Sequence, residues 1–164
     1  MSPRLAVMLS GSGRTLLNLI ESIRQDRLHA EIALVIASRE GLGAERARQA
    51  ALETIVMKGD IPASVLHEVL VRRRIDWVVL AGYLKRIAIP PLYRGRIVNI
   101  HPSLLPEFGG QGMYGHHVHE AVLKAGRHQS GCTVHLVDEE YDRGPIVLQK
   151  SCPVVPGDTP DTLA

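Results

Sequence analysis

Short apolar runs alternate with amphipathic stretches along most of this chain. The runs are rich in valine, isoleucine and leucine, which is typical of buried parallel strands. They lie at residues 4–9, 32–37, 54–57, 77–81 and 97–100. Stretches with apolar residues at helical spacing lie between them, at residues 16–23, 44–51 and 64–73. Ser64 is the candidate N-cap of the last of these. This alternation predicts an α/β fold with a mainly parallel sheet and helices on both faces.

The pattern changes after Gly126. Two strand-like runs, residues 132–137 and 146–155, flank a turn-rich segment and predict an antiparallel C-terminal hairpin. A short turn or helix at residues 90–93, a glycine-rich loop at 108–115 and a helix near 116–124 precede them. The whole pattern predicts a Rossmann-like fold in one domain, residues 1–164. A helix capped by Asp or Thr begins near the end, so we expect this domain to lack its C-terminal helix.

Composition narrows the class of protein. The 164 residues carry a formal net charge of +2, too small to predict nucleic-acid binding. No apolar run is long enough to cross a membrane, and we expect no signal peptide. Cys132 and Cys152 fall in strand-like segments, so we expect reduced, buried thiols and a cytoplasmic protein.

The segment from Asn99 to Pro106, Asn-Ile-His-Pro-Ser-Leu-Leu-Pro, carries candidate chemistry. Residues two apart on a strand share a face, so Asn99 and His101 should point the same way and polarise one carbonyl. Asp142 lies further along the chain, and folding would bring its carboxylate to the imidazole and favour the protonated ring. The alternatives are a structural histidine and a turn in which Gly144 supplies a positive φ.

A glycine-rich loop, Ser-Gly-Ser-Gly-Arg-Thr at residues 10–15, joins the first strand to the first helix. Such a loop can present backbone N–H groups to an anion. It lacks the Walker ending, and Leu16 stands where the third glycine of a dinucleotide fingerprint would be, so a single phosphate fits best. The alternative is a tight turn that needs glycine for its dihedral angles.

Three histidines, His116, His117 and His119, raise the question of a metal site. Only His116 and His119 share a helix face, and no second pair has zinc-site spacing, so we predict no metal. Ser103 lies in no nucleophile elbow.

Together these motifs, with Asp142-x-Gly-Pro and Leu80-Ala-Gly-Tyr-Leu84, resemble the phosphoribosylglycinamide formyltransferase family over nearly the whole chain. The Asn-x-His-Pro-Ser-Leu-Leu-Pro motif is shared by the wider formyltransferase-fold group, which includes methionyl-tRNA formyltransferase and formyltetrahydrofolate hydrolase. It therefore specifies formyl chemistry better than the acceptor. The Ser-Gly-Ser-Gly-Arg-Thr loop favours the glycinamide enzymes.

The resemblance implies roles for particular residues. Asn99 and His101 would polarise the formyl oxygen, while Asp142 would orient His101 and help to move a proton through water. Gly13, Arg14 and Thr15 would bind the ribonucleotide phosphate. The cosubstrate 10-formyltetrahydrofolate would be held by the residues of a folate set, Leu84, Lys85, Arg86, Ile87, Asn99, Asp138 and Asp142. Direct transfer of this kind needs no metal.

The expected function is formyl transfer from 10-formyltetrahydrofolate to the amine of glycinamide ribonucleotide in de novo purine biosynthesis. The alternatives are hydrolysis of the formylfolate, formyl transfer to another amine, and a non-catalytic nucleotide-binding module. The partners would be small molecules, and the protein a monomer or homodimer. Three departures from the family pattern bear on the folate contacts: a longer loop at residues 107–118, the pair Lys85-Arg86, and no arginine at residues 62–64, where Lys58 is the candidate substitute.

Overall fold

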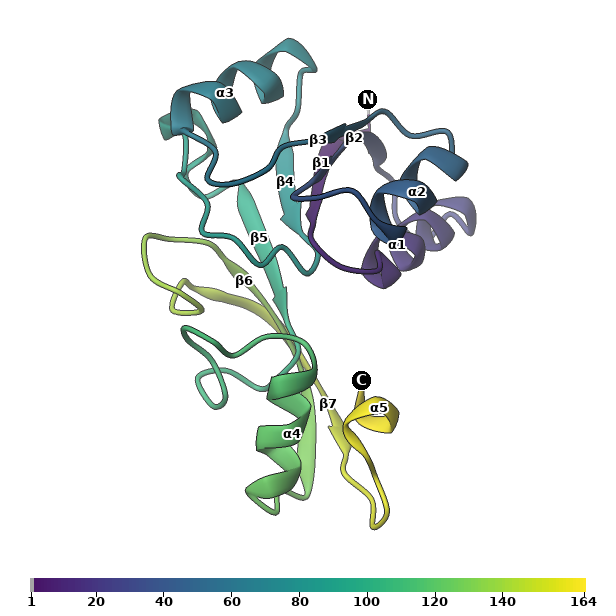
Figure 1. The fold of residues 1–164 in the computed structure, drawn as a ribbon, viewed down its shortest axis with the longest axis vertical. Helices are drawn as coiled ribbons and strands as arrows, with labels where there is room; N and C mark the ends of the chain where they lie inside the picture. The colour runs from purple at the N-terminus through teal and green to yellow at the C-terminus, as the bar shows by residue number, and fades with distance from the viewer. Residues whose placement is uncertain (1) are drawn as a thin grey trace. The chain divides into compact units, whose positions relative to one another are not determined.

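The computed structural model describes residues 2–164, which divide into two compact units with the boundary after Ile97 (Figure 1). Each unit has its own strands and helices. The prediction of one formyltransferase domain over residues 1–164, lacking its C-terminal helix, is not tested by this division and stays a prediction.

The first unit is built on a parallel sheet. Its strands pair in the order β3-β2-β1-β4. Their bounds are β1 Arg4–Leu9, β2 Glu31–Ala37, β3 Thr54–Val56 and β4 Trp77–Leu80. Leu5 to Leu9 of β1 are all buried, because this strand has a neighbour on each side and side chains over both faces. The apolar runs of the sequence thus become the centre of the first core.

Helices cover both faces of this sheet. Figure 1 shows α1 (Arg14–Arg24) and α2 (Leu42–Gln49) on one side, and α3 (Ala63–Arg72) on the other. Right-handed crossovers require this arrangement, since the order of the strands reverses at β1. A short 3₁₀ helix, Pro91–Tyr93, follows β4.

The prediction that Ser64 caps α3 is wrong. The helix begins at Ala63, its cap is Pro62, and no side chain caps it. The backbone of Pro62, at φ −59°, already leads into the helix, so Ser64 lies inside the first turn and is exposed.

The second unit is antiparallel. Its strands pair in the order β5-β6-β7, with bounds β5 Ile97–His101, β6 Gln129–Leu136 and β7 Ile146–Pro153. Ile97, the first residue of β5, is also the last residue of the first unit. Helices α4 (His116–Lys124) and α5 (Pro160–Leu163) complete the unit, and Thr159 caps α5 as predicted. The predicted α/β class, parallel first and antiparallel at the C-terminus, is confirmed.

A buried hydroxyl organises the turn that follows β5. Thr133, fully buried on β6, donates from Oγ1 to the carbonyl of Ser103 at 2.6 Å. The same oxygen accepts from the amide of Leu105 at 3.0 Å and from Nε2 of Gln149 at 2.9 Å. Gln149 also donates to the carbonyl of Leu105. One hydroxyl on β6 therefore satisfies polar groups on two other segments, the turn after β5 and strand β7.

The prediction that both cysteines are buried is wrong. Cys132 is half-buried and Cys152 is exposed, both as free thiols. Every residue of β7 is exposed, because this strand lies at the edge of its sheet. An apolar run therefore indicates a strand here without indicating burial.

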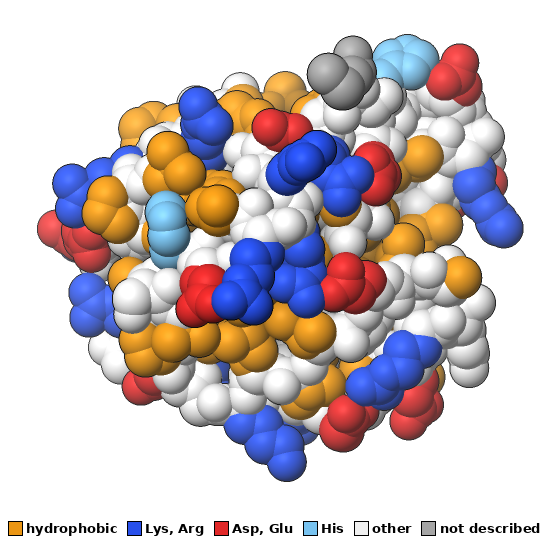
Figure 2. All heavy atoms as spheres, turned by 90° about the horizontal axis from the view of Figure 1, so that it is seen from above, with side chains coloured by type: hydrophobic (Ala, Val, Ile, Leu, Met, Phe, Trp, Pro, Cys, Tyr) orange, Lys and Arg blue, Asp and Glu red, His pale blue; other side chains and the backbone are white. Residues whose placement is uncertain are grey.

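Charges of both signs are mixed on the surface. Seen from above in Figure 2, Lys and Arg side chains lie beside Asp and Glu side chains. Ion pairs in the first unit, such as Arg73 with Glu53 and Arg4 with Glu31, agree with this view. Among the described helices, none is both long and apolar enough to span a membrane.

We expect Thr133→Val to lower the free energy of unfolding by about 2–4 kcal/mol, because it leaves the buried amide of Leu105 and carbonyl of Ser103 without their shared partner. Urea denaturation measures this change. Thr54→Val is the matched control, since the Thr54 hydroxyl makes a single hydrogen bond, to the carbonyl of Leu52. Equal losses in the two variants would contradict the central position of Thr133.

Candidate active site

Antiparallel pairing of β5 and β6 places polar side chains opposite one another. Asn99 lies opposite His135, and His101 lies opposite Thr133. Nδ2 of Asn99 is 3.1 Å from Nε2 of His135. His101 and His135 are 3% and 2% exposed, so both imidazoles must find polar partners inside the protein.

Asp142 is the shared partner of these side chains. It lies in the segment between β6 and β7. Its Oδ1 is 3.4 Å from both Nδ2 of Asn99 and Nε2 of His135, and its Oδ2 is 3.4 Å from Nδ1 of His101. The backbone amide of Gly110 donates to Oδ2 at 2.9 Å. The structure thus brings together Asn99, His101 and Asp142, the three residues predicted to be catalytic.

The turn that carries Asp142 differs from the predicted one. The positive φ, 56°, lies at Asp142 itself and not at Gly144. Gly144 is needed for close packing instead, because a Cβ there would be 1.8 Å from the carbonyl oxygen of Leu136. The role of this glycine is therefore to let the turn approach the end of β6.

Asp142 and His135 shift one another's pKa. Burial disfavours the protonated ring of His135, but hydrogen bonds to Asp142 and to the carbonyl of Leu136 outweigh it and raise its pKa. Burial likewise disfavours the carboxylate of Asp142, yet the hydrogen bonds from His135 and Gly110 lower its pKa below the usual value. The pKa of each group is therefore shifted in the direction that favours its charged form.

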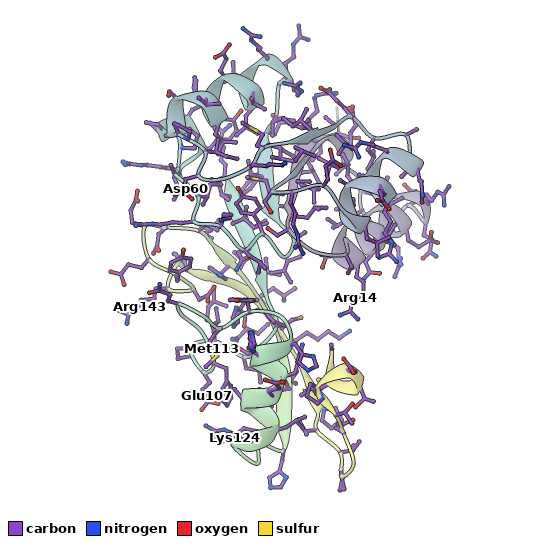
Figure 3. All side chains as sticks on the ribbon, viewed as in Figure 1. Arg14, Asp60, Glu107, Met113, Lys124 and Arg143 are labelled. Atoms are coloured by element: carbon purple, nitrogen blue, oxygen red, sulfur yellow. The ribbon has the colours of Figure 1, made fainter. Side chains whose placement is uncertain are left out.

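The loop from Glu107 to Gly115 lies against this group. The carbonyl of Phe108 accepts from Nε2 of His101 at 2.8 Å, which puts a proton on that nitrogen. Gly109 packs so closely that a Cβ there would be 2.5 Å from Cδ2 of Leu105 and 3.3 Å from Cβ of Asp142. Arg127 pairs with Glu107 at 2.7 Å and lies over the ring of Phe108. The labelled Glu107 and Met113 mark this loop in Figure 3.

The glycine-rich loop of the first unit precedes α1. Gly13 is the N-cap at φ 76°, and no side chain caps the helix, so its first N–H groups have no side-chain acceptor. The loop packs on α2, because a Cβ on Gly43 would be 2.4 Å from the carbonyl oxygen of Gly11. Arg14 is exposed and projects from the start of α1 (Figure 3), and Thr15 is half-buried. Helical N–H groups without a side-chain acceptor are able to bind an anion.

The carbonyl oxygens of the same loop are held by two arginines. Arg39 donates from Nε to the carbonyl of Ser10 at 2.9 Å, and Arg46 donates from Nη1 to the carbonyl of Ser12 at 2.7 Å. These contacts add positive charge beside the loop and restrain its backbone.

The residues of the predicted folate set fall in both units. Leu84, Lys85 and Arg86 are exposed after β4, Ile87 is half-buried, and the amide of Leu84 donates to Oγ of Ser10 at 3.0 Å. Asp138 lies just after β6, is exposed, and accepts from the amide of Glu140. Asn99 and Asp142 belong to the group described above.

Sequence reasoning missed His135 and the backbone groups of Phe108 and Gly110. His135 had a detectable signal, because Thr133 and His135 are polar residues on one face of a strand and need buried partners. The backbone groups have none, since any residue type supplies an amide and a carbonyl.

The histidines of α4 do not gather ligands. His116 lies 3.3 Å from Glu120 and 3.6 Å from Asp161, both ion-pair contacts at exposed positions, while His119 is buried. Among residues 2–164 no three His, Cys, Asp or Glu side chains are grouped as a metal ion would require.

Known proteins resemble this chain along its length. The model of the formyl transferase family matches residues 3–164. A trifunctional purine biosynthetic protein adenosine-3 of Drosophila pseudoobscura pseudoobscura is 42% identical over 98% of this chain, which spans 12% of that protein. The chloroplastic phosphoribosylglycinamide formyltransferase of Arabidopsis thaliana is 39% identical over 98% of this chain, which spans 59% of that protein.

A solved structure shows the same fold. Glycinamide ribonucleotide transformylase 1 from Symbiobacterium toebii has a TM-score of 0.87 and 36% identity, over 99% of this chain and 78% of that one. By sequence and by fold, the chain belongs to the formyl transferase family.

Proposed function

We propose that this chain transfers the formyl group of 10-formyltetrahydrofolate to the amine of glycinamide ribonucleotide in purine biosynthesis. The observation that carries the proposal is the convergence of Asn99, His101 and Asp142 at hydrogen-bonding range. The names of the Arabidopsis relative and the Symbiobacterium structure support the choice of acceptor. Both substrates are small molecules, and the free thiols support a reducing, cytoplasmic setting.

The reaction is acyl transfer without a covalent enzyme intermediate. The neutral amine attacks the formyl carbon, and negative charge develops on the formyl oxygen. The amide of Asn99 and the N–H of His101 are the donors that stabilise this charge. The attacking nitrogen then loses a proton, for which Asp142 is the acceptor through water, and N10 of the folate gains one as the C–N10 bond breaks.

The ionisation of His135 decides what Asn99 can do. The ring nitrogen 3.1 Å from the Asn99 amide accepts a hydrogen bond only when it is unprotonated. Protonation of His135 commits this nitrogen to Asp142 and releases the amide of Asn99 for the formyl oxygen. A raised pKa of His135 therefore favours the reactive arrangement.

The loop at residues 107–115, which contacts His101 and Asp142, must move during the reaction. The carbonyl of Phe108 occupies Nε2 of His101, and the amide of Gly110 occupies Oδ2 of Asp142. Substrate has to replace these contacts before the two side chains can act on it. The glycines at 109 and 110 lower the barrier to such a rearrangement.

The glycine-rich loop at residues 10–15, the anion loop, distinguishes the proposed reaction from its alternatives. Hydrolysis needs only water as acceptor, whereas a loop with uncapped helical N–H groups and a nearby arginine favours a phosphorylated acceptor. A non-catalytic nucleotide-binding module would have no need of a buried carboxylate and imidazole whose pKa values are shifted toward their charged forms, an arrangement that is costly unless it serves a function. Gly13, Arg14 and Thr15 are the proposed phosphate ligands, and residues 84–87 with Asp138 the proposed folate contacts.

Removing a member of the catalytic group should slow the reaction. We expect His101→Ala and Asp142→Asn each to lower turnover by on the order of a hundredfold or more, since each removes a proton donor or acceptor. Initial rates of tetrahydrofolate release measure the effect, with Ser64→Ala on the exposed surface of α3 as control. A wild-type rate for Asp142→Asn at every pH would exclude its assigned role.

A substitution on α2, against which the anion loop packs, should weaken the binding of glycinamide ribonucleotide only. In Gly43→Ala the new Cβ would lie 2.4 Å from the carbonyl oxygen of Gly11 and 2.7 Å from Cδ1 of Leu9, so the loop must shift. We expect the KM for glycinamide ribonucleotide to rise by about tenfold or more, with little change for the formylfolate. Gln49→Ala, exposed at the other end of α2, is the control. Equal effects on both substrates would count against the phosphate assignment.

The Asp142–His135 pair should stabilise the protein in a defined pH range. The lowered pKa of Asp142 stabilises the fold above its usual value of 3.8, and this is lost as the pH falls through the lowered pKa. The raised pKa of His135 stabilises the fold below its usual value of 6.5, and this is lost as the pH rises through the raised pKa. The pair therefore contributes most between these two usual values.

Urea denaturation of wild type and Asp142→Asn tests this range. We expect the variant to lose about 1–3 kcal/mol at about pH 5 and less at about pH 9. In a His135→Gln background the difference should no longer decline from the lower to the higher pH. A constant difference in the presence of His135 would show that the two residues do not titrate as a pair.

A further inference from the structure

Ser10 directly follows β1 and begins the anion loop, and other segments of the first unit form hydrogen bonds with each of its polar atoms. Its amide donates to the carbonyl of Gly82 at 3.0 Å, and its carbonyl accepts from Nε of Arg39 at 2.9 Å. Its hydroxyl accepts from the amide of Leu84 at 3.0 Å and from the hydroxyl of Ser38 at 2.7 Å. Ser10 and Ser38 are 6% and 8% exposed, so water competes little for these bonds.

Ser10 lies where the central strand of the parallel sheet ends. β1 lies between β2 and β4, and the strand order reverses there. Ser38 follows β2, whereas Gly82 and Leu84 follow β4. The hydroxyl therefore links the carboxyl ends of three parallel strands, where doubly wound sheets bind their ligands.

Two loops with different proposed ligands meet on this hydroxyl. One is the anion loop, residues 10–15, and the other is the segment 84–87 after β4. The amide of Leu84, at the start of the second loop, has Ser10 as its acceptor. Hydrogen bonds to Gly82 and Arg39 hold the backbone of Ser10 in place. A movement of one loop relative to the other would therefore lengthen the bond between the Leu84 amide and the Ser10 hydroxyl.

We propose that Ser10 is a positioning residue that holds both loops in one arrangement, so that a single hydroxyl supports the binding of both substrates. The inference rests on the proposed function, because it assigns the nucleotide phosphate to the first loop and the pterin to the second. Ser10 acts here through the backbone that it restrains.

Arg46 contacts the anion loop but not the segment after β4, so its substitution is a matched control for that of Ser10. Its guanidinium donates to the carbonyl of Ser12, inside the anion loop. Loss of this contact should loosen the anion loop and remove a positive charge beside it, without affecting the amide of Leu84. Arg46→Gln should therefore weaken glycinamide ribonucleotide alone.

Steady-state kinetics of the full chain with both substrates tests the inference. We expect Ser10→Ala to raise the KM for glycinamide ribonucleotide and the KM for 10-formyltetrahydrofolate, each about three- to tenfold, as the loss of neutral hydrogen bonds predicts. The kcat should stay within about twofold, because no reacting atom is touched. Ser10→Thr, which keeps a hydroxyl, should restore part of both KM values.

The controls separate this inference from the proposed function. Arg46→Gln should raise only the KM for glycinamide ribonucleotide, and Ser64→Ala should raise neither. If wild type transfers no formyl group to glycinamide ribonucleotide, the proposed function fails whatever Ser10 does. If wild type is active and Ser10→Ala changes one KM or none, the positioning role is overturned.

A second variant covers the case in which Ser10→Ala does not fold. Ser38→Ala removes one of the two bonds to the Ser10 hydroxyl and leaves the amide of Leu84 in place. It should raise both KM values together by about two- to threefold. Unchanged KM values in a folded Ser38→Ala protein would also overturn the inference.

Discussion

The register of β5 against β6 is the constraint on which the second unit depends. It sets Asn99 opposite His135 and His101 opposite Thr133, so that one strand pair presents an amide, two imidazoles and a hydroxyl. A slip of one residue would turn these side chains to the other face and bury apolar ones in their place. The register therefore specifies the site and the core together.

From this register, β6 supports the candidate site in two ways. The hydroxyl of Thr133 holds the turn at Ser103 and Leu105, which directly follows His101. His135, two residues on, binds Asp142 and the carbonyl of Leu136. The loop and the carboxylate that flank His101 are thus both fixed by neighbouring positions of one strand. In the first unit glycine does the comparable work, since the closeness of Gly43 to Gly11 sets the shape of the anion loop.

The sequence predicts most of the fold, because burial and helical spacing leave a pattern in the apolar residues. It also predicts Asn99, His101 and Asp142 as a group, because their types have a joint chemical use. It does not predict which side chains are exposed on an edge strand. Cys152 is exposed, although its apolar neighbours in the sequence indicate a buried position. The sequence likewise assigns the positive φ to Gly144, when the close approach to Leu136 explains that glycine and Asp142 takes the strained backbone. Such facts depend on contacts between distant segments, which no local pattern records.

Two buried histidines, His101 and His135, have different polar neighbours. A carboxylate as buried as that of Asp142, with 10% of its side chain exposed, needs compensation for lost hydration. The raised pKa of His135 favours a positive charge beside it, and the amide of Gly110 supplies a hydrogen-bond donor. Nε2 of His101 donates instead to the carbonyl of Phe108, on a glycine-rich loop, and under the proposed function a substrate oxygen replaces this contact. The structure thus places the partner that offsets the charge of Asp142 on strand β6, and it holds Nε2 of His101, the proposed donor to the formyl oxygen, against a glycine-rich loop.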